Sequence, residues 1–190
     1  MRLNASVKTW AALALSVAAF VPLIAVATAQ SVPPNVARRQ QDMKAMADAA
    51  KSINAMFKGT SAYDSKRFKA AAETIRSQSG TALSTLFEGS MTAAGSKASS
   101  NIETERQQFD KLALDLSSYA AALSVAADRN RDALGPGMRM QAGDAVAGGG
   151  PLAKRIDPAR DATSMSAEHA FHLMLQTCTS CHAKFRVESK

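Results

Sequence analysis

Five residues near the C-terminal end, Cys178-Thr179-Ser180-Cys181-His182, constrain this chain more than any other part of its sequence. The C-x-x-C-H pattern is typical of c-type haem attachment, in which each thiol bonds a vinyl group of the porphyrin and the histidine binds the iron. Cys178, Cys181 and His182 stand at i, i+3 and i+4, so they project from one face of an α-helix. The motif therefore predicts a helix that carries one covalent haem c.

Two other readings of the cysteine pair have less support in the sequence. A thioredoxin-like redox pair, and with it a thiol oxidoreductase, is expected near a βαβ pattern, and no strand-like alternation precedes Cys178. A structural zinc site usually needs four ligands, and the chain has only two cysteines. His169 and His172 lie on the same predicted helix as His182, so we expect them at the surface or packed against a loop.

The N-terminus predicts export. Arg2 and Lys8 precede an uncharged apolar run from Trp10 to Ala27, and Ala27-Thr28-Ala29 is a small-x-small cleavage site. This is the pattern of a secretory signal peptide over residues 1–29, followed by a single domain over 30–190 in the periplasm. The alternative is an uncleaved anchor, because the run is about as long as the shortest membrane-spanning helices. Cleavage would leave no integral membrane span.

The charge pattern argues against nucleic acid as a partner. The full chain has 23 Lys and Arg against 16 Asp and Glu, and loss of Arg2 and Lys8 leaves 21 against 16, a net charge of +5. The basic residues are scattered among acids, without the clustered stripe of nucleic-acid-binding proteins. The surplus favours an acidic redox partner protein or an anionic surface.

Hydrophobic spacing predicts four helices and therefore an all-α, antiparallel up-down four-helix bundle. The first covers about 36–58, with Asn35 as its N-cap, and the second starts after the cap Asp64. Ser100 and Glu103 form a capping-box signature before the third, and the fourth covers about 166–186. A Gly/Pro-rich loop at about 135–165 separates the last two, with a helical turn near Pro158; we expect it to flank the haem edge. The inward positions are listed by helix: Arg39, Met43, Met46, Ala50, Ile53 and Phe57; Phe68, Ala72 and Ile75; Ile102, Phe109, Leu112, Leu116, Tyr119, Leu123 and Ala126; Phe171, Met174, Leu175, Cys178, Cys181, His182 and Phe185.

With these elements in place, the chain resembles the class II c-type cytochromes, the cytochrome c′ family, and most closely their low-spin cytochrome c-556 branch. The haem motif continues as His182-Ala183-Lys184-Phe185-Arg186, similar to the family's C-x-x-C-H-x-x-[FY]-R. Residues 39–46, RQQDMKAM, are similar to R-Q-x-x-[ML]-x-x-M in the first helix, and Phe87-Glu88-Gly89-Ser90 is a weaker match. The resemblance covers about 35–130 and 166–187.

The resemblance implies a role for six residues. Cys178 and Cys181 would be the thioether anchors and His182 the proximal iron ligand. Arg186 would lie beside the proximal imidazole, and Arg39 near a haem propionate. Met43 would face the sixth coordination site. It would ligate the iron in the c-556 branch, whereas an apolar residue at that position leaves the iron five-coordinate in the cytochrome c′ branch.

We expect Met43 to ligate the iron. As a thioether ligand it would raise the haem potential, so the function we expect is one-electron transfer in the periplasm by a His/Met-ligated haem protein that is not an enzyme. Methionine on a helix face is also common core filler, and Met46 is the reserve ligand in the same stripe. If the sixth site is open, a gas-binding protein for nitric oxide or carbon monoxide is the alternative. The resemblance also allows a homodimer.

Overall fold

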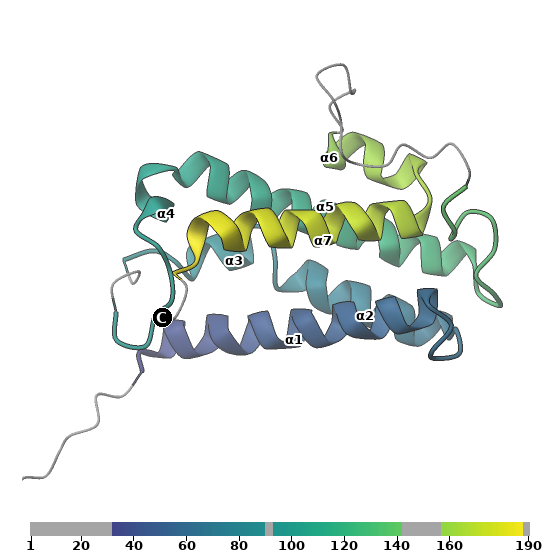
Figure 1. Cartoon of the computed structure of the whole chain (residues 1–190), viewed down its shortest axis with the longest axis horizontal. Helices are drawn as coiled ribbons and strands as arrows, with labels where there is room; N and C mark the ends of the chain where they lie inside the picture. The colour runs from purple at the N-terminus through teal and green to yellow at the C-terminus, as the bar shows by residue number, and fades with distance from the viewer. Residues whose placement is uncertain (1–31, 90–92, 142–156, 188–190) are drawn as a thin grey trace, which may run out of the picture. The chain divides into compact units, whose positions relative to one another are not determined.

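The computed structural model describes residues 32–89, 93–141 and 157–187, so the predicted signal peptide lies outside the described residues. Four long helices form the bundle: α1 (Pro34–Phe57), α2 (Ser65–Ser77), α5 (Arg106–Arg129) and α7 (Ala167–Phe185). Three short helices join them, α3 (Thr81–Thr85), α4 (Asn101–Thr104) and α6 (Pro158–Asp161), together with the 3₁₀ turn η1 (Ala162–Ser164). The long helices alternate in direction (Figure 1), which confirms the up-down bundle. The described residues form no β-strand, only an isolated antiparallel bridge between Ala98 and Arg186.

The helix starts agree with the sequence in two of four places. Asp64 accepts a hydrogen bond from the Arg67 backbone N–H (2.9 Å), and Ser166 accepts one from that of His169 (3.4 Å), so both are N-caps. The prediction for Asn35 is wrong, because α1 already begins at Pro34. Proline has no N–H to satisfy and a fixed φ, which suits it to the first helical position.

The predicted capping box at Ser100 is also wrong. Ser100 precedes α4 but makes no side-chain capping hydrogen bond. The expected continuous third helix is interrupted at Glu105, whose φ of −124° and ψ of 40° separate α4 from α5. Glu105 forms an ion pair with Lys184 on α7 instead. The break between α4 and α5, which the spacing of hydrophobic residues did not predict, thus coincides with a contact to α7.

The predicted inward faces are confirmed for the centre of each long helix. Ile53, Phe68, Leu123 and Met174 are all at most 1% exposed. The main core cluster joins α1, α2, α5 and α7, and a smaller cluster of Leu83, Phe87, Ile102, Phe109, Ala113 and Phe185 lies where α7 ends. Gly80 lets α2 turn into α3, because its φ of +61° is a conformation that residues with a Cβ rarely adopt.

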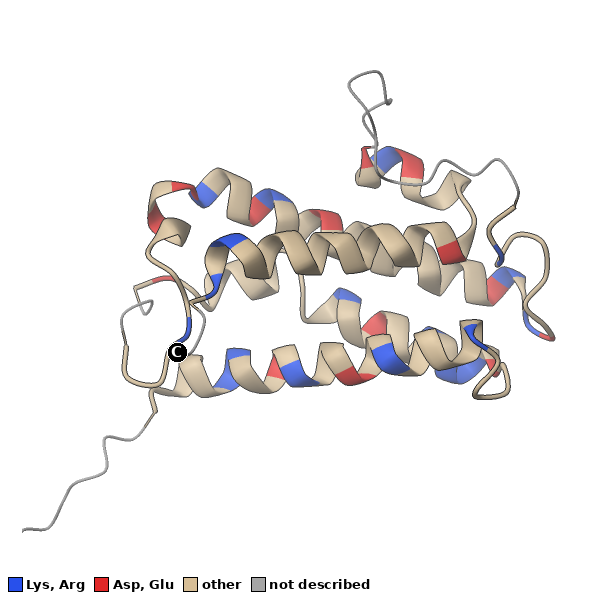
Figure 2. Cartoon of the chain, viewed as in Figure 1, with Lys and Arg blue, Asp and Glu red and all other residues tan. Residues whose placement is uncertain are grey.

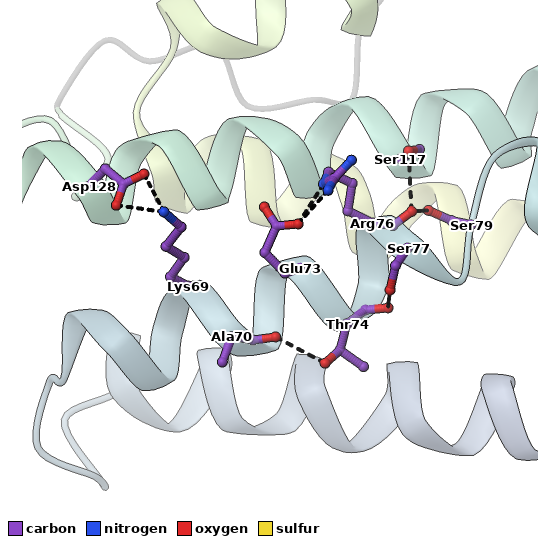
Figure 3. Close-up of polar contacts among 9 residues, drawn as sticks. All are labelled: Lys69, Ala70, Glu73, Thr74, Arg76, Ser77, Ser79, Ser117 and Asp128. Atoms are coloured by element: carbon purple, nitrogen blue, oxygen red, sulfur yellow. Dashed lines mark hydrogen bonds and ion pairs between the residues drawn. The ribbon is translucent and has the colours of Figure 1, made fainter.

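Polar contacts cover the outer surface of α2 and α5. Figure 3 shows Lys69 of α2 paired with Asp128 of α5 (2.6 Å) and Arg76 paired with Glu73 within α2 (2.7 Å). Basic and acidic side chains are mixed along α1 and α5, whereas α7 carries few charged side chains (Figure 2). None of the helices in the described part of the chain is long and apolar enough to cross a membrane.

The described parts of the Gly/Pro-rich segment do not flank the haem motif. Pro158 begins α6, which confirms the helical turn, but α6 and η1 pack on α5. Ala167 and Glu168 at the start of α7 bond the carbonyls of Gly137 and Met138. With about 1.5 Å of rise per residue, His182 lies about 22 Å further along α7. The prediction that this segment flanks the haem edge is therefore wrong for residues 135–141 and 157–165. Residues 142–156 lie outside the described residues.

Candidate haem site

The last turns of α7 carry the three residues of the motif. Both cysteines are free and partly buried, and His182 lies at the surface of the helix with its imidazole partly covered by neighbouring groups. Burial raises the pKa of the Cys178 thiol, and burial followed by the nearby Cys178 raises that of Cys181 to about 11. Redox-active cysteines have lowered pKa values, because the thiolate is the reactive form. These thiols are protonated at neutral pH, which disfavours a thiol oxidoreductase.

The surroundings of His182 favour the neutral form of its imidazole. Burial lowers the pKa of its imidazole, and the charge of Arg186 lowers it further. A neutral imidazole nitrogen is a common metal ligand. Arg186 is the exposed residue that ends α7. The charge of Arg186 thus acts on the imidazole, and its role beside a proximal ligand stays a prediction.

Two hollows lie between α1 and α7 on either side of His182. The first has a volume of about 550 Å³ and the second about 510 Å³, within the range of small-molecule and cofactor sites. Cys181 lines the first and Cys178 the second, while Met43, Ala47 and His182 line both. One flat apolar group attached to both sulfurs would therefore extend into both hollows, so these residues fit a haem.

Met43 lies on α1 where the two hollows meet. It is partly buried and packs against both core clusters, and it shares the hollows with His182 on the opposite helix. Met46 is 7% exposed and lines only the second hollow. Met43 is therefore better placed than Met46 to meet a group held by His182.

Arg39 is at the edge of the first hollow, but its guanidinium already has protein partners. The side chain is 4% exposed. It donates to the Leu86 carbonyl (3.1 Å) and to Ser96 Oγ (2.7 Å), and it lies 4.5 Å from the centre of the Phe87 ring. Burial lowers its pKa. A propionate contact for Arg39 stays a prediction.

Three aromatic side chains form one wall of the first hollow. The sequence placed Phe185 on the face of the haem motif but did not bring the three together. Phe87, Phe109 and Phe185 line the first hollow, and the Phe109 ring lies 4.9 Å from Phe87 and 5.4 Å from Phe185. Helical spacing identified Phe109 and Phe185 as inward residues. It could not show that they meet Phe87, which lies 22 residues before Phe109 in the chain.

The other histidines take no part in the site. His172 is exposed, with Nδ1 3.2 Å from Sδ of the loop residue Met140, as expected for packing against a loop. His169 is 6% exposed and is thus a core residue, so a surface position for it is wrong. No group of three or more His, Cys, Asp or Glu residues that could hold a metal ion occurs in the described ranges.

Comparisons with known proteins agree with this arrangement. The family model described as Cytochrome C' matches residues 35–145. No curated protein sequence matches the chain. The structure of cytochrome c′ from Thermochromatium tepidum is similar over 81% of this chain and 95% of that one, with 20% identity and a TM-score of 0.57.

Two further structures show the same fold. Cytochrome c′ from Rhodopseudomonas palustris is 23% identical over 83% of this chain and 99% of that one, with a TM-score of 0.57. A nitric oxide complex of a variant of cytochrome c prime from Alcaligenes xylosoxidans is 19% identical over 82% and 94%, with a TM-score of 0.56. The family model covers more than half of the chain, so the chain belongs to the cytochrome c′ family, whose members carry one covalent haem c.

Proposed function

We propose that Cys178 and Cys181 anchor the haem of this protein through thioether bonds and that His182 is the proximal ligand. The placement of both thiols and the imidazole on one face of α7, beside the two hollows, supports these roles. We further propose that the chain is exported to the periplasm through residues 1–29, because thioether attachment and a signal-peptide pattern belong together in bacterial c-type cytochromes.

The function proposed first is reversible binding of a diatomic gas, nitric oxide or carbon monoxide, on the side of the haem that faces α1. Haem iron supplies the binding atom when the group is present. The second hollow is lined mainly by apolar side chains, and its lining residues on α1 include the small Ala47. Such a lining leaves space for a small apolar ligand. Family membership and the nitric oxide complex of the structural neighbour support this reading.

One observation keeps electron transfer as a second candidate. Met43 lines both hollows together with His182, and its thioether is a soft ligand that raises the potential of a haem. A sulfur that occupies the sixth position would exclude gases and make the protein a one-electron carrier of the c-556 type. The surface around the haem would then dock an acidic redox partner.

An absorption spectrum of the reduced, exported protein with and without carbon monoxide separates the two functions. We expect broad high-spin bands and rapid carbon monoxide uptake for a gas-binding protein. Sharp low-spin bands that carbon monoxide does not change would establish the carrier instead. A colourless product with two unmodified thiols would refute both.

A Met43→Leu variant tests whether the Met43 sulfur is the sixth ligand of the iron, which separates electron transfer from gas binding. Leucine keeps most of the volume but has no sulfur, so a low-spin spectrum that becomes high-spin would assign ligation to Met43. A spectrum that is the same in both proteins would limit Met43 to packing.

Neither function makes or breaks a substrate bond, so we propose that the protein is not an enzyme. We also propose that it can form a homodimer, as a neighbour with a ligand-controlled dimer dissociation does; that neighbour is 16% identical with a TM-score of 0.57.

A further inference from the structure

A short segment, residues 93–99, connects the beginning of α1 with the end of α7; we call it the strap. Figure 1 shows it at the end of the bundle where α1 starts and α7 finishes. On the α1 side, Ser96 Oγ accepts a hydrogen bond from Arg39 (2.7 Å) and the Gly95 carbonyl accepts one from Gln40 Nε2 (2.9 Å). Ser96 Oγ also accepts from the Ala98 N–H (3.1 Å), which fixes the turn of the strap.

The other end of the strap is bonded to the residues that follow the haem motif. The Ser99 N–H donates to the Phe185 carbonyl (2.9 Å), and the Val187 N–H donates to the Lys97 carbonyl (2.9 Å). These two bonds enclose the isolated bridge between Ala98 and Arg186. The strap is therefore joined by hydrogen bonds to both helices that carry the site.

Arg39 is the most buried of the strap's partners on α1. One face of its guanidinium lies over the Phe87 ring, while its edge donates to Leu86 and Ser96. A planar cation with five N–H groups can stack and donate in two directions at once, which a lysine ammonium cannot do. Bonds from a charged donor are also about twice as strong as neutral ones.

The rest of the boundary between α1 and α7 explains why this connection matters. The backbones of these two helices pack together much less extensively than those of α2 with α5 or α5 with α7. Side chains meet at the far end, where the Phe57 and Phe171 rings are 5.6 Å apart. Between that contact and the strap lie the two hollows. The direct contacts that the structure gives between α1 and α7 thus lie near the two ends, while α2 and α5 join the two helices indirectly.

We propose that Arg39 is a positioning residue that, through the strap, fixes the distance between α1 and α7 and so controls how closely Met43 approaches the haem. This inference rests on the proposed function, because it assigns Met43 a place opposite the metal. It differs from a propionate contact, which would need only the charge of Arg39.

The test compares Arg39→Ala, Arg39→Lys and Ser96→Ala with Lys111→Ala. Lys111 is the matched control, since it is an exposed helical cation remote from the strap's hydrogen bonds. The first measurement is amide hydrogen exchange at Ser99 and Val187 in the protein as purified. We expect Arg39→Ala to speed this exchange about tenfold relative to the control, although Arg39 touches neither amide.

The second measurement is the reduced absorption spectrum with the carbon monoxide dissociation constant. Arg39→Ala should shift the carbon monoxide dissociation constant by about threefold or more. Ser96→Ala should shift this constant in the same direction. Arg39→Lys should not restore the wild-type value. Unchanged amide exchange at Ser99 and Val187 in Arg39→Ala would overturn the proposal. A wild-type dissociation constant in both Arg39→Lys and Ser96→Ala would overturn it as well. A product without haem would instead refute the proposed function, and the exchange rates would still decide whether Arg39 controls the strap.

Discussion

The two sides of α7 differ in what fills the space beside the helix. Toward α5, the interface is filled by side chains of the core, such as Ala120 and Leu123 of α5 and Ala170 of α7, all 0% exposed. Toward α1, the same helix faces two hollows, and Ala47 on α1 remains exposed. Both sides have apolar residues at helical spacing. The difference shows that this spacing predicts which residues face inward but not whether protein or cofactor fills the space between them.

The most severe change on the open side is removal of both thiols. Cys178→Ala combined with Cys181→Ala should abolish covalent haem attachment entirely. Mass spectrometry of the denatured protein measures this, because attached haem adds on the order of 600 Da. If the added mass persists in the double variant, the thioether assignment is wrong. The single variants serve as controls that retain one possible bond.

On the filled side, the largest expected effect is on stability. Leu123→Ala removes a fully buried side chain of α5, and such truncations usually lower the free energy of unfolding by about 2–5 kcal/mol. Urea denaturation followed by circular dichroism would measure the loss. A loss below about 1 kcal/mol would mean that the α5–α7 interface is less tightly packed than its burial indicates.

A substitution to alanine on the open side sharpens the contrast. Met43→Ala removes a side chain of similar size that is only partly buried, so we expect a loss of about 1 kcal/mol in the same urea experiment. Its main effect should be on the absorption spectrum and on carbon monoxide affinity, which Leu123→Ala should leave unchanged because Leu123 lines neither hollow. Equal losses of stability for the two variants would contradict the distinction between a filled and an open side.

The smallest expected effect is at the outer surface. Lys69→Ala removes the ion pair with Asp128 between α2 and α5, in which both side chains are about half exposed. Exposed pairs usually contribute about 0.2–1 kcal/mol. The free energy of unfolding should fall by no more than that and should become less sensitive to salt. A larger loss would show that this pair, rather than the apolar core, holds α2 on α5.

Prediction from sequence was strongest where chemistry and geometry are both local. The Asp64 cap, the helix start near Ser166, the turn at Pro158 and the helix of the C-x-x-C-H motif each depend on residues within one or two turns. Asn35 was assigned as a cap from residue type alone, although Pro34 is also well suited to begin a helix. The break at Glu105 accompanies a contact with Lys184 that lies 79 residues away.

The sequence alone determined the helical bundle, the attachment face of α7 and the candidate ligands, because the period of a helix and the chemistry of sulfur and imidazole can be read over a few neighbouring residues. Only the tertiary structure decided that α1 and α7 enclose two hollows, that Met43 rather than Met46 borders both, and that Arg39 bonds a strap. These features join residues tens of positions apart, and their geometry depends on the packing of all four helices.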